Sequence, residues 1–198
     1  MSYSRTEEEA LIGAFFGDRN TGFFIDIGAS DGITASNTRA LWERGWTGVF
    51  IEPSLDSFLK LAANYHGCER ATLLNVAVGT KSALNPFFIH PEMSEWASLS
   101  SDWVATWKTK PIVQHVLTVR LDQVTSLAVP DFLSIDTEGL DADIIESLPA
   151  TYCPELILAE IDKGDAETRI QACLSSRGYK RIWSTIGNAA WSFRPEVC

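Results

Sequence analysis

The stretch Phe24-Ile25-Asp26-Ile27-Gly28-Ala29-Ser30-Asp31-Gly32 decides the fold, because an apolar run reaches an acid and then breaks into a glycine-containing turn. Further along the chain, the apolar run Gly48-Val49-Phe50-Ile51-Glu52-Pro53 also reaches an acid. Strand, glycine turn, helix, strand and acid, in this order, is how a chain builds a site for a nucleotide-like ligand. The details of the turn then decide which ligand that site takes.

The alternation of strands and helices continues beyond these two runs. Apolar runs predict further strands at 73–78, 132–136 and 156–161. Helical spacing and capping residues predict helices at 5–16, 36–45, 54–65, 141–148 and 165–177. Two last runs, 179–184 and 190–194, are joined at Gly187-Asn188 and predict a C-terminal antiparallel hairpin. Together these units predict an α/β fold, a three-layer α/β/α sandwich with a mostly parallel sheet.

Residues 80–118 interrupt this pattern. The segment contains several prolines and the tryptophans Trp96, Trp103 and Trp107. Short strands are expected at 87–90 and 116–121, with irregular or short helical structure between them. A chain of 198 residues suits one domain. We therefore expect a single domain over 1–198 with a variable, Trp-rich insert at about 80–118, a length that usually carries function or a lid.

Composition narrows the range of partners. The formal net charge is −10 and no basic stripe is present, which argues against nucleic acid as a partner. There is no apolar segment long enough for a membrane span, and the polar, acidic N-terminus is unlike a signal peptide. The cysteines are scattered, with no C-x-x-C pair, at Cys68, Cys153, Cys173 and Cys198. We therefore expect reduced thiols in a cytoplasmic protein.

The glycine turn favours a ligand with a positive centre. The dinucleotide signature G-x-G-x-x-G holds a pyrophosphate, but the middle glycine is missing here. Asp26 and Asp31 would also repel a pyrophosphate. S-adenosylmethionine carries a sulfonium and an ammonium and no phosphate, and Glu52 can accept hydrogen bonds from its ribose. Each piece alone has a plainer interpretation, as a turn, a helix cap or a solvated acid, and only their order and spacing favour the cofactor.

The same turn also fits the nucleophile elbow G-x-S-x-G of hydrolases, with Ser30 as the nucleophile. That interpretation needs a histidine late in the chain. The histidines are His66, His90 and His115, all before the strands predicted at 132–136 and 156–161. The elbow would also follow the first strand, which is too early for that fold. The sequence therefore disfavours a hydrolase.

Further short blocks follow the opening stretch in order: Ser36-Asn37-Thr38, Gly45-Trp46-Thr47-Gly48, Ile51-Glu52-Pro53, Asn75-Val76-Ala77-Val78-Gly79, Leu121-Asp122 and Ser134-Ile135-Asp136-Thr137-Glu138-Gly139. In these blocks, over about residues 20 to 162, the chain resembles the FkbM-type methyltransferases, a branch of the S-adenosylmethionine-dependent Rossmann-like enzymes. The chain departs from that pattern at Ser134, where many members have Lys, so no role of such a lysine carries over.

The resemblance implies S-adenosylmethionine as the cofactor and a Rossmann-like methyltransferase fold. It also implies methyl transfer, usually to a hydroxyl of a sugar or a secondary metabolite. The acceptor would then be a small molecule or a carbohydrate. Carried over by motif, the cofactor contacts are Asp26, Gly28, Ser30, Asp31, Gly32, Asn37, Glu52, Pro53, Val76 and Ala77.

An alcohol acceptor must lose its proton during methyl transfer. Asp136 is the first candidate for the general base or the acceptor-positioning group, and Glu138 is the second. His115, or His90, is an alternative base in the insert. The plainer interpretation of the two acids is that they stabilise the N-terminus of the following helix. A metal ion would need acids that converge on one point, such as Asp136 with Asp162 and Asp165. We predict no metal site.

Two hypotheses about function therefore stand side by side. The first is an S-adenosylmethionine-dependent O-methyltransferase. The second is a catalytically silent module with the same fold that binds a partner.

Overall fold

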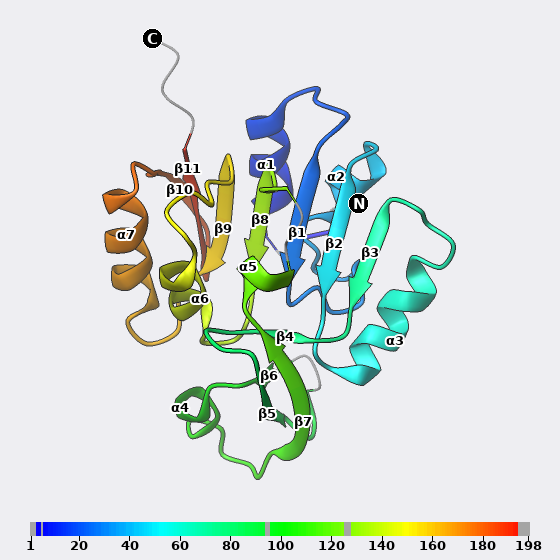
Figure 1. Ribbon diagram of the computed structural model, residues 1–198, viewed down its shortest axis with the longest axis vertical. Coiled ribbons are helices and arrows are strands. Elements are labelled where there is room, and N and C mark those ends of the chain that lie inside the picture. The colour runs from blue at the N-terminus through cyan, green and yellow to red at the C-terminus, as the bar shows by residue number, and fades with distance from the viewer. Residues whose placement is uncertain (1–2, 5, 94–95, 125–127, 194–198) are drawn as a thin grey trace.

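The computed structural model describes residues 3–4, 6–93, 96–124 and 128–193. Its main sheet has seven strands in the order β10-β11-β9-β8-β1-β2-β3 (Figure 1). The strands are β1 Phe23–Ile27, β2 Thr47–Ile51, β3 Ala71–Leu74, β8 Phe132–Ile135, β9 Leu156–Glu160, β10 Lys180–Ser184 and β11 Asn188–Ser192. Five of them run parallel, and β11 is antiparallel to both β9 and β10. The mostly parallel sheet and its C-terminal hairpin are thus confirmed.

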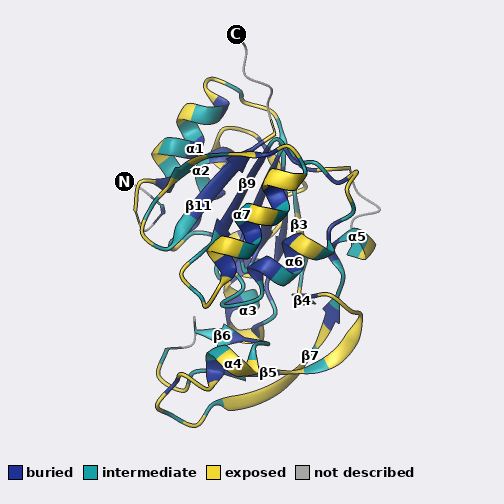
Figure 2. Ribbon diagram, turned by 90° about the vertical axis from the view of Figure 1, so that its left-hand side faces the viewer, coloured by how far each residue is buried: buried dark blue, intermediate teal, exposed yellow. Residues whose placement is uncertain are grey.

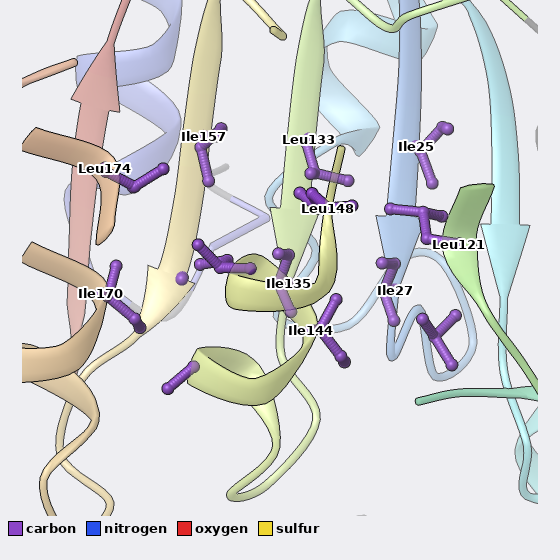
Figure 3. Close-up of a cluster of buried hydrophobic side chains, with 14 of the residues drawn as sticks. Ile25, Ile27, Leu121, Leu133, Ile135, Ile144, Leu148, Ile157, Ile170 and Leu174 are labelled. Carbon is purple, nitrogen blue, oxygen red and sulfur yellow. The ribbon is translucent and has the colours of Figure 1, made fainter. Parts of the chain in front are cut away.

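Alternation along the central strands gives the sheet two apolar faces. On β1, Ile25 and Ile27 point to the side covered by helices α6 Asp141–Ser147 and α7 Ala166–Ser176. Figure 3 shows the resulting core of aliphatic side chains. Because strands of a parallel sheet are covered on both faces, they are apolar throughout. Figure 2 shows these central strands buried and the outer surface of α7 exposed.

The opposite face of the sheet is aromatic. Phe24, Phe50 and Phe132 pack there against helices α1 Glu8–Phe16, α2 Arg39–Glu43 and α3 Leu55–Asn64. Phe24 and Phe50 meet edge to face, with ring centroids 5.2 Å apart. Helices on both faces of the sheet confirm the three-layer α/β/α prediction.

The strand order places a crevice between β1 and β8. From β1 the chain builds outward through β2 and β3, and it then returns to the other side of β1 to lay down β8 and β9. Loops leave the carboxyl ends of β1 and β8 in opposite directions, and ligands bind at such a switch point. The opening stretch of the sequence ends at this position, at the carboxyl end of β1.

The insert forms a second, four-stranded sheet in the order β4-β7-β5-β6, with the short helix α4 Ser101–Val104. Its strands are β4 Ala77–Val78, β5 Ala83–Ile89, β6 Ala97–Ser98 and β7 Ile112–Val119. This sheet lies below the carboxyl ends of the parallel strands (Figure 1). The short helix α5 Leu121–Val124 then leads back toward the main sheet.

Three predicted strands differ from the structure, and the one expected at 87–90 begins earlier, at Ala83. The strand expected at 73–78 is divided, because β3 pairs with β2 in the main sheet while β4 pairs with β7 in the second. The strand expected at 116–121 begins earlier, at Ile112, and pairs along the whole of β5. None of these differences changes the position of the cavity at the carboxyl ends of the parallel strands. In the last predicted strand, Arg194 lies outside the described residues.

Two further findings bear on the expectations from composition. None of the helices that the structure describes is both long and apolar enough to span a membrane. Cys68, Cys153 and Cys173 are free thiols. Cys198 lies outside the described residues.

Candidate active site

A cavity of about 740 Å³ opens at the carboxyl ends of the parallel strands, over the crevice between β1 and β8. Acidic side chains from four of these ends reach it, namely Asp26, Glu52, Asp136 and Glu160. The insert supplies part of the wall through Phe87, Trp96, Ala97 and Leu99. A large cavity with convergent polar groups at this position is the default binding site of such a sheet.

Asp26, which belongs to the opening stretch 24–32, lines the cavity. It is 5% exposed, and Thr38 Oγ1 donates a hydrogen bond of 2.6 Å to its Oδ2. Burial raises the pKa of Asp26 to about 6; the hydrogen bond from Thr38 opposes this rise, and the charge of Asp136 adds to it. Thr38 is itself fully buried at the N-terminal end of α2, so the predicted helix start also holds the first acid in place.

Glu52 ties the glycine turn to the end of β2. Its Oε2 accepts a hydrogen bond from the backbone N–H of Ser30 at 2.9 Å, and its Oε1 accepts one from the N–H of Ser54 at 2.7 Å. Burial raises the pKa of Glu52 to about 7. Each carboxylate oxygen has a second lone pair, so Glu52 can still accept from two neighbouring hydroxyls of a ligand.

The backbone of the turn offers no nest for a phosphate. The N–H groups of Gly28 and Ala29 both donate to Ile51 O, at 2.9 and 3.1 Å, and that of Gly32 donates to Ala29 O at 2.8 Å. With Ser30 bound to Glu52, four of the backbone donors that could face a pyrophosphate, those of Gly28, Ala29, Ser30 and Gly32, are already used. Helix α2 begins only at Arg39. The prediction that this turn is not a pyrophosphate site therefore has a structural cause.

The two glycines of the turn have different roles. Gly28 has φ +84°, and a Cβ there would lie 1.8 Å from Asp136 O, so only glycine allows β1 and β8 to approach so closely. Gly32 faces the helix layer, where a Cβ would meet Tyr65 and Leu61 at 2.6 and 2.7 Å. Gly32 was predicted as a cofactor contact, but the structure places it against these side chains and not among the residues that line the cavity.

The other predicted cofactor residues do line the cavity: Asp26, Gly28, Ser30, Asp31, Asn37, Glu52, Pro53, Val76 and Ala77. Asp31 is held by the backbone N–H groups of Ile33 and Thr34, at 2.8 and 2.7 Å. These contacts lower the pKa of Asp31 in spite of its partial burial. The turn thus presents one acid that is charged at neutral pH beside others that titrate near neutrality.

A second group of acids lies at the ends of β8 and β9. Carboxylate oxygens of Asp136, Glu138 and Glu160 all lie within 4.8 Å of one another. Burial raises the pKa of Glu138 to about 7, with a further contribution from the charge of Asp136. Burial, followed by the charges of Asp136 and Glu138, also raises the pKa of Glu160. This end of the cavity therefore holds buried carboxyls, of which Glu138 titrates near neutral pH, where a proton acceptor must work.

Glu138 is held in an uncommon backbone conformation. Its φ is +54°, in the left-handed region that favours glycine. The buried Ser98, from β6 of the insert, donates from Oγ to Glu138 O at 2.7 Å. Backbone strain of this kind often marks functional sites. Asp141, the first residue of α6, is instead the acid in the first turn of that helix, and its Oδ2 accepts from Thr137 Oγ1 at 2.8 Å.

The histidines do not reach the site. His115 is exposed on β7, opposite Pro86, and it is not among the residues lining the cavity. His90 packs between the rings of Trp96 and Trp107, at 5.7 and 5.4 Å. The structure therefore removes His115 and His90 as bases for this cavity. Because none of the three histidines lines the cavity, Ser30 also lacks the histidine that a hydrolase needs.

Some residues of the site were missed from the sequence. Glu160 and Lys163 line the acidic end, although Asp162 and Asp165 had been considered there. Asp165 is 76% exposed in its side chain and points to Arg169 instead. The position of Glu160, at the carboxyl end of a predicted parallel strand, is the signal that could have indicated it. Nothing in the sequence around Lys163 indicated that this residue would reach the cavity.

Comparison with known proteins decides the class. Residues 26–180 match the family model described as the methyltransferase FkbM domain. The chain belongs to this family. It is therefore an S-adenosylmethionine-dependent methyltransferase, as the blocks in its sequence predicted. A comparison with curated proteins gave no match.

Solved methyltransferases share the fold of this FkbM-family protein at low sequence identity. The precorrin-6y C5,15-methyltransferase from Geobacter metallireducens GS-15 is 15% identical, with a TM-score of 0.52, and 91% of this chain and 75% of that chain are covered. A putative tRNA methyltransferase from Streptococcus pneumoniae is 13% identical, with a TM-score of 0.52 and coverage of 94% and 69%. The METTL16 MTase domain is 14% identical, with a TM-score of 0.53 and coverage of 95% and 65%. These likenesses show the fold.

The residues present fit S-adenosylmethionine. The donors of the glycine turn are used internally, and acids surround the crevice, which suits a ligand with positive centres and no phosphate. Burial raises the pKa values of Asp26 and Glu52, and repulsion from the charge of Asp136 adds to that effect at both. A cationic ligand would relieve that repulsion.

Without a ligand, the methyltransferase is expected to lose stability as the pH rises from about 5 to about 8. Burial raises the pKa values of Asp26, Glu52 and Asp141 to about 6, 7 and 7. Between the ordinary carboxyl value of about 4 and these raised values, the folded chain holds more protons than the unfolded chain. The free energy of unfolding therefore falls with rising pH in this window.

Thermal melts at about pH 5.5 and about pH 8 measure this effect, and we expect the Tm to be lower by more than about 5 °C at the higher pH. Saturating S-adenosylmethionine should reduce the difference. A Tm that is equal at both pH values would show that the acids are not held in the buried state described.

Proposed function

We propose that this FkbM-family enzyme methylates a hydroxyl oxygen on a small molecule or a sugar, with Glu138 as the proton acceptor and Asp136 as the acceptor-positioning group. The observation that carries the proposal is the juxtaposition in one cavity of the turn at 26–31 with the acids at the end of β8. Gly28 and Asp136 are in backbone contact, so a methyl group held over the turn would face these acids.

The division of the cavity supports separate cofactor and acceptor parts. Asp26, Asp31 and Glu52 would hold the cofactor, with Glu52 on the ribose hydroxyls. Val76 and Ala77 would lie beside the adenine, at the start of the segment that leads into the insert. Beyond Asp136, the cavity is lined by acids, by Asn188 and by Trp96, groups that can bind the hydroxyls and the ring face of a sugar.

The transfer needs little more than positioning and proton removal. The bound cofactor supplies a methyl group whose bond to sulfur breaks as its carbon bonds to the acceptor oxygen. Asp136 orients the reacting hydroxyl by accepting a hydrogen bond from a neighbouring hydroxyl of the acceptor. Glu138 takes the proton of the reacting hydroxyl, and its pKa of about 7 matches the needs of a base at neutral pH.

The acidic wall also favours a neutral acceptor over a polyanion. The structural neighbours include enzymes named for precorrin and for tRNA, so the fold alone leaves the acceptor open. Here the far end of the cavity carries Glu138, Glu160 and Asp162, and Lys163 at this end is already paired with them. Phosphate groups would be repelled there, which supports a neutral, hydroxyl-rich acceptor over nucleic acid.

A transfer assay with radiolabelled S-adenosylmethionine tests the proposal. The panel contains neutral sugars and polyols, matched sugar phosphates and a bulk RNA sample. We expect label in a neutral hydroxyl compound, released by conditions that cleave methyl ethers and stable to those that cleave methyl esters. Label found only in RNA, or only on nitrogen or carbon, would contradict the O-methylation proposal.

A further inference from the structure

Lys163 lies at the acidic end of the cavity, among Glu138, Glu160 and Asp162. Its Nζ is 3.0 Å from Glu160 Oε1, 3.1 Å from Asp162 Oδ1 and 3.5 Å from Glu138 Oε2. From the insert, the ring of Trp103 covers the ammonium, with 4.3 Å between Nζ and the ring. The side chain is 15% exposed, so the ammonium is enclosed by carboxylates and an indole.

The lysine remains charged in this position. Partial burial opposes its charged form, but the charges of Glu160 and Glu138 outweigh that effect and raise the pKa of Lys163 above its ordinary value. One ammonium thus offsets part of the repulsion among the acids. The cation–π contact with Trp103 further favours the charged form.

The carboxylates around Lys163 have the spacing of metal ligands. Oxygens of Asp136, Glu138 and Glu160 lie within 4.8 Å of one another, and such oxygen sets suit Mg²⁺ or Mn²⁺. The ammonium contacts two of these three acids, so a divalent ion bound among them would meet a positive charge at close range. Lys163 therefore competes with a metal ion for the same carboxylates.

Two oxygens of this group are ready for an acceptor. Glu138 Oε2 and Glu160 Oε2 are buried and have no hydrogen-bond partner among the described residues, although Glu138 Oε2 is ion-paired with Lys163 Nζ at 3.5 Å. Buried acceptors of this kind are normally satisfied in a working protein. Hydroxyl groups of an acceptor that enters the cavity can supply the missing donors.

We propose that Lys163 is a positioning residue that acts as a built-in cation, holding Glu138 and Glu160 for a neutral hydroxyl-bearing acceptor without a divalent metal ion. This inference rests on the proposed function for its acceptor. Its statement about metal does not depend on any acceptor. The ammonium supplies the positive charge that would otherwise require a metal, and the insert fixes that charge through Trp103.

Titration with Mn²⁺, followed by electron paramagnetic resonance of the free ion, tests this role without cofactor or acceptor. The proteins compared are the wild type, Glu160→Gln, Lys163→Met, Lys163→Arg and the double variant Lys163→Met/Glu160→Gln. Methionine keeps most of the length of lysine and removes its charge. We expect the Lys163→Met protein to bind Mn²⁺ at least about tenfold more tightly than the wild type. Lys163→Arg should match the wild type, and the double variant should lose the gain.

The inference is overturned if the wild type itself binds Mn²⁺ and Glu160→Gln removes that binding. It is equally overturned if folded Lys163→Met gains no affinity for Mn²⁺. Calorimetry with S-adenosylmethionine verifies that each variant is folded. If Lys163→Met does not fold, the wild-type and Glu160→Gln titrations still test the inference, because Mn²⁺ binding by the wild type through Glu160 would overturn it. Failure of these metal titrations would leave the proposed methyl transfer standing, whereas failure of the labelled transfer assay would leave the metal result unaffected.

Discussion

Replacing Glu138 by Gln is expected to lower turnover by about 10²- to 10⁴-fold while the affinity for S-adenosylmethionine stays within about threefold of the wild type. The side chain lies at the acceptor end of the cavity, and Gln keeps its size while removing its ability to take a proton. The cofactor part of the cavity is built from other residues, so binding of the cofactor should persist. Single-turnover rates with labelled cofactor and binding by calorimetry separate the two effects.

Asp136→Asn is the companion to this variant. It should also keep cofactor binding and lose turnover, because the acceptor hydroxyl loses its orienting carboxylate. This variant differs from Glu138→Gln in the pH dependence of its remaining activity. The charge of Asp136 raises the pKa of Glu138, so removing that charge should move the acid limb of the pH–rate profile to lower pH.

Asp165→Asn is the matched control for both variants, since Asp165 is exposed and lies outside the residues that line the cavity. Its activity should equal that of the wild type. Full activity of Glu138→Gln would refute Glu138 as the proton acceptor. An unshifted profile in Asp136→Asn would refute the electrostatic link between the two acids.

Replacing Gly28 by Ala is expected to destabilise the protein by more than about 3 kcal/mol and to abolish cofactor binding. A Cβ at Gly28 would lie 1.8 Å from Asp136 O, a backbone atom that cannot move away without displacing β8. The residue also has φ +84°, so alanine would be strained even in open space. Chemical denaturation measures the loss of stability, and calorimetry measures the loss of binding.

The variant Gly67→Ala separates the effect of backbone strain from the effect of a steric clash. Gly67 has φ +72°, similar to Gly28, but a Cβ there would meet nothing within 4 Å. It should cost only about 1 kcal/mol and leave cofactor binding intact. If the two alanine variants were equally stable, the close approach of β1 and β8 at Gly28 would not exist as described.

The cofactor half of the site could be predicted because it is local in sequence. Asp26 is the penultimate residue of β1, Gly28 follows the last one, and Glu52 follows β2, which is adjacent to β1 in the sheet. A strand, its turn and the next strand fix the relative positions of these residues almost regardless of the rest of the chain. The sequence alone therefore placed them near one another, and the family blocks gave the same residues.

The acceptor half could not be predicted because it depends on contacts between distant segments. Lys163 meets Glu138 only because β9 lies beside β8, and it meets Trp103 only because the insert folds back below the main sheet. The insert was expected to hold only two short strands, at 87–90 and 116–121, yet β7 begins at Ile112 and pairs along all of β5. His115 looked available as a base, but that pairing places it on the exposed surface of the second sheet.

The most direct measurement of the central claim is calorimetric titration of the wild-type protein and Glu52→Gln with S-adenosylmethionine. We expect the wild type to bind one equivalent. Glu52→Gln should bind about 10- to 100-fold more weakly, because the ribose would lose its charged hydrogen-bond acceptor. Glu167→Gln, on the exposed side of α7 beside Arg181, should bind as the wild type does. Failure of the wild type to bind at millimolar cofactor, or an unchanged affinity in Glu52→Gln, would contradict the account of this cavity as the cofactor site.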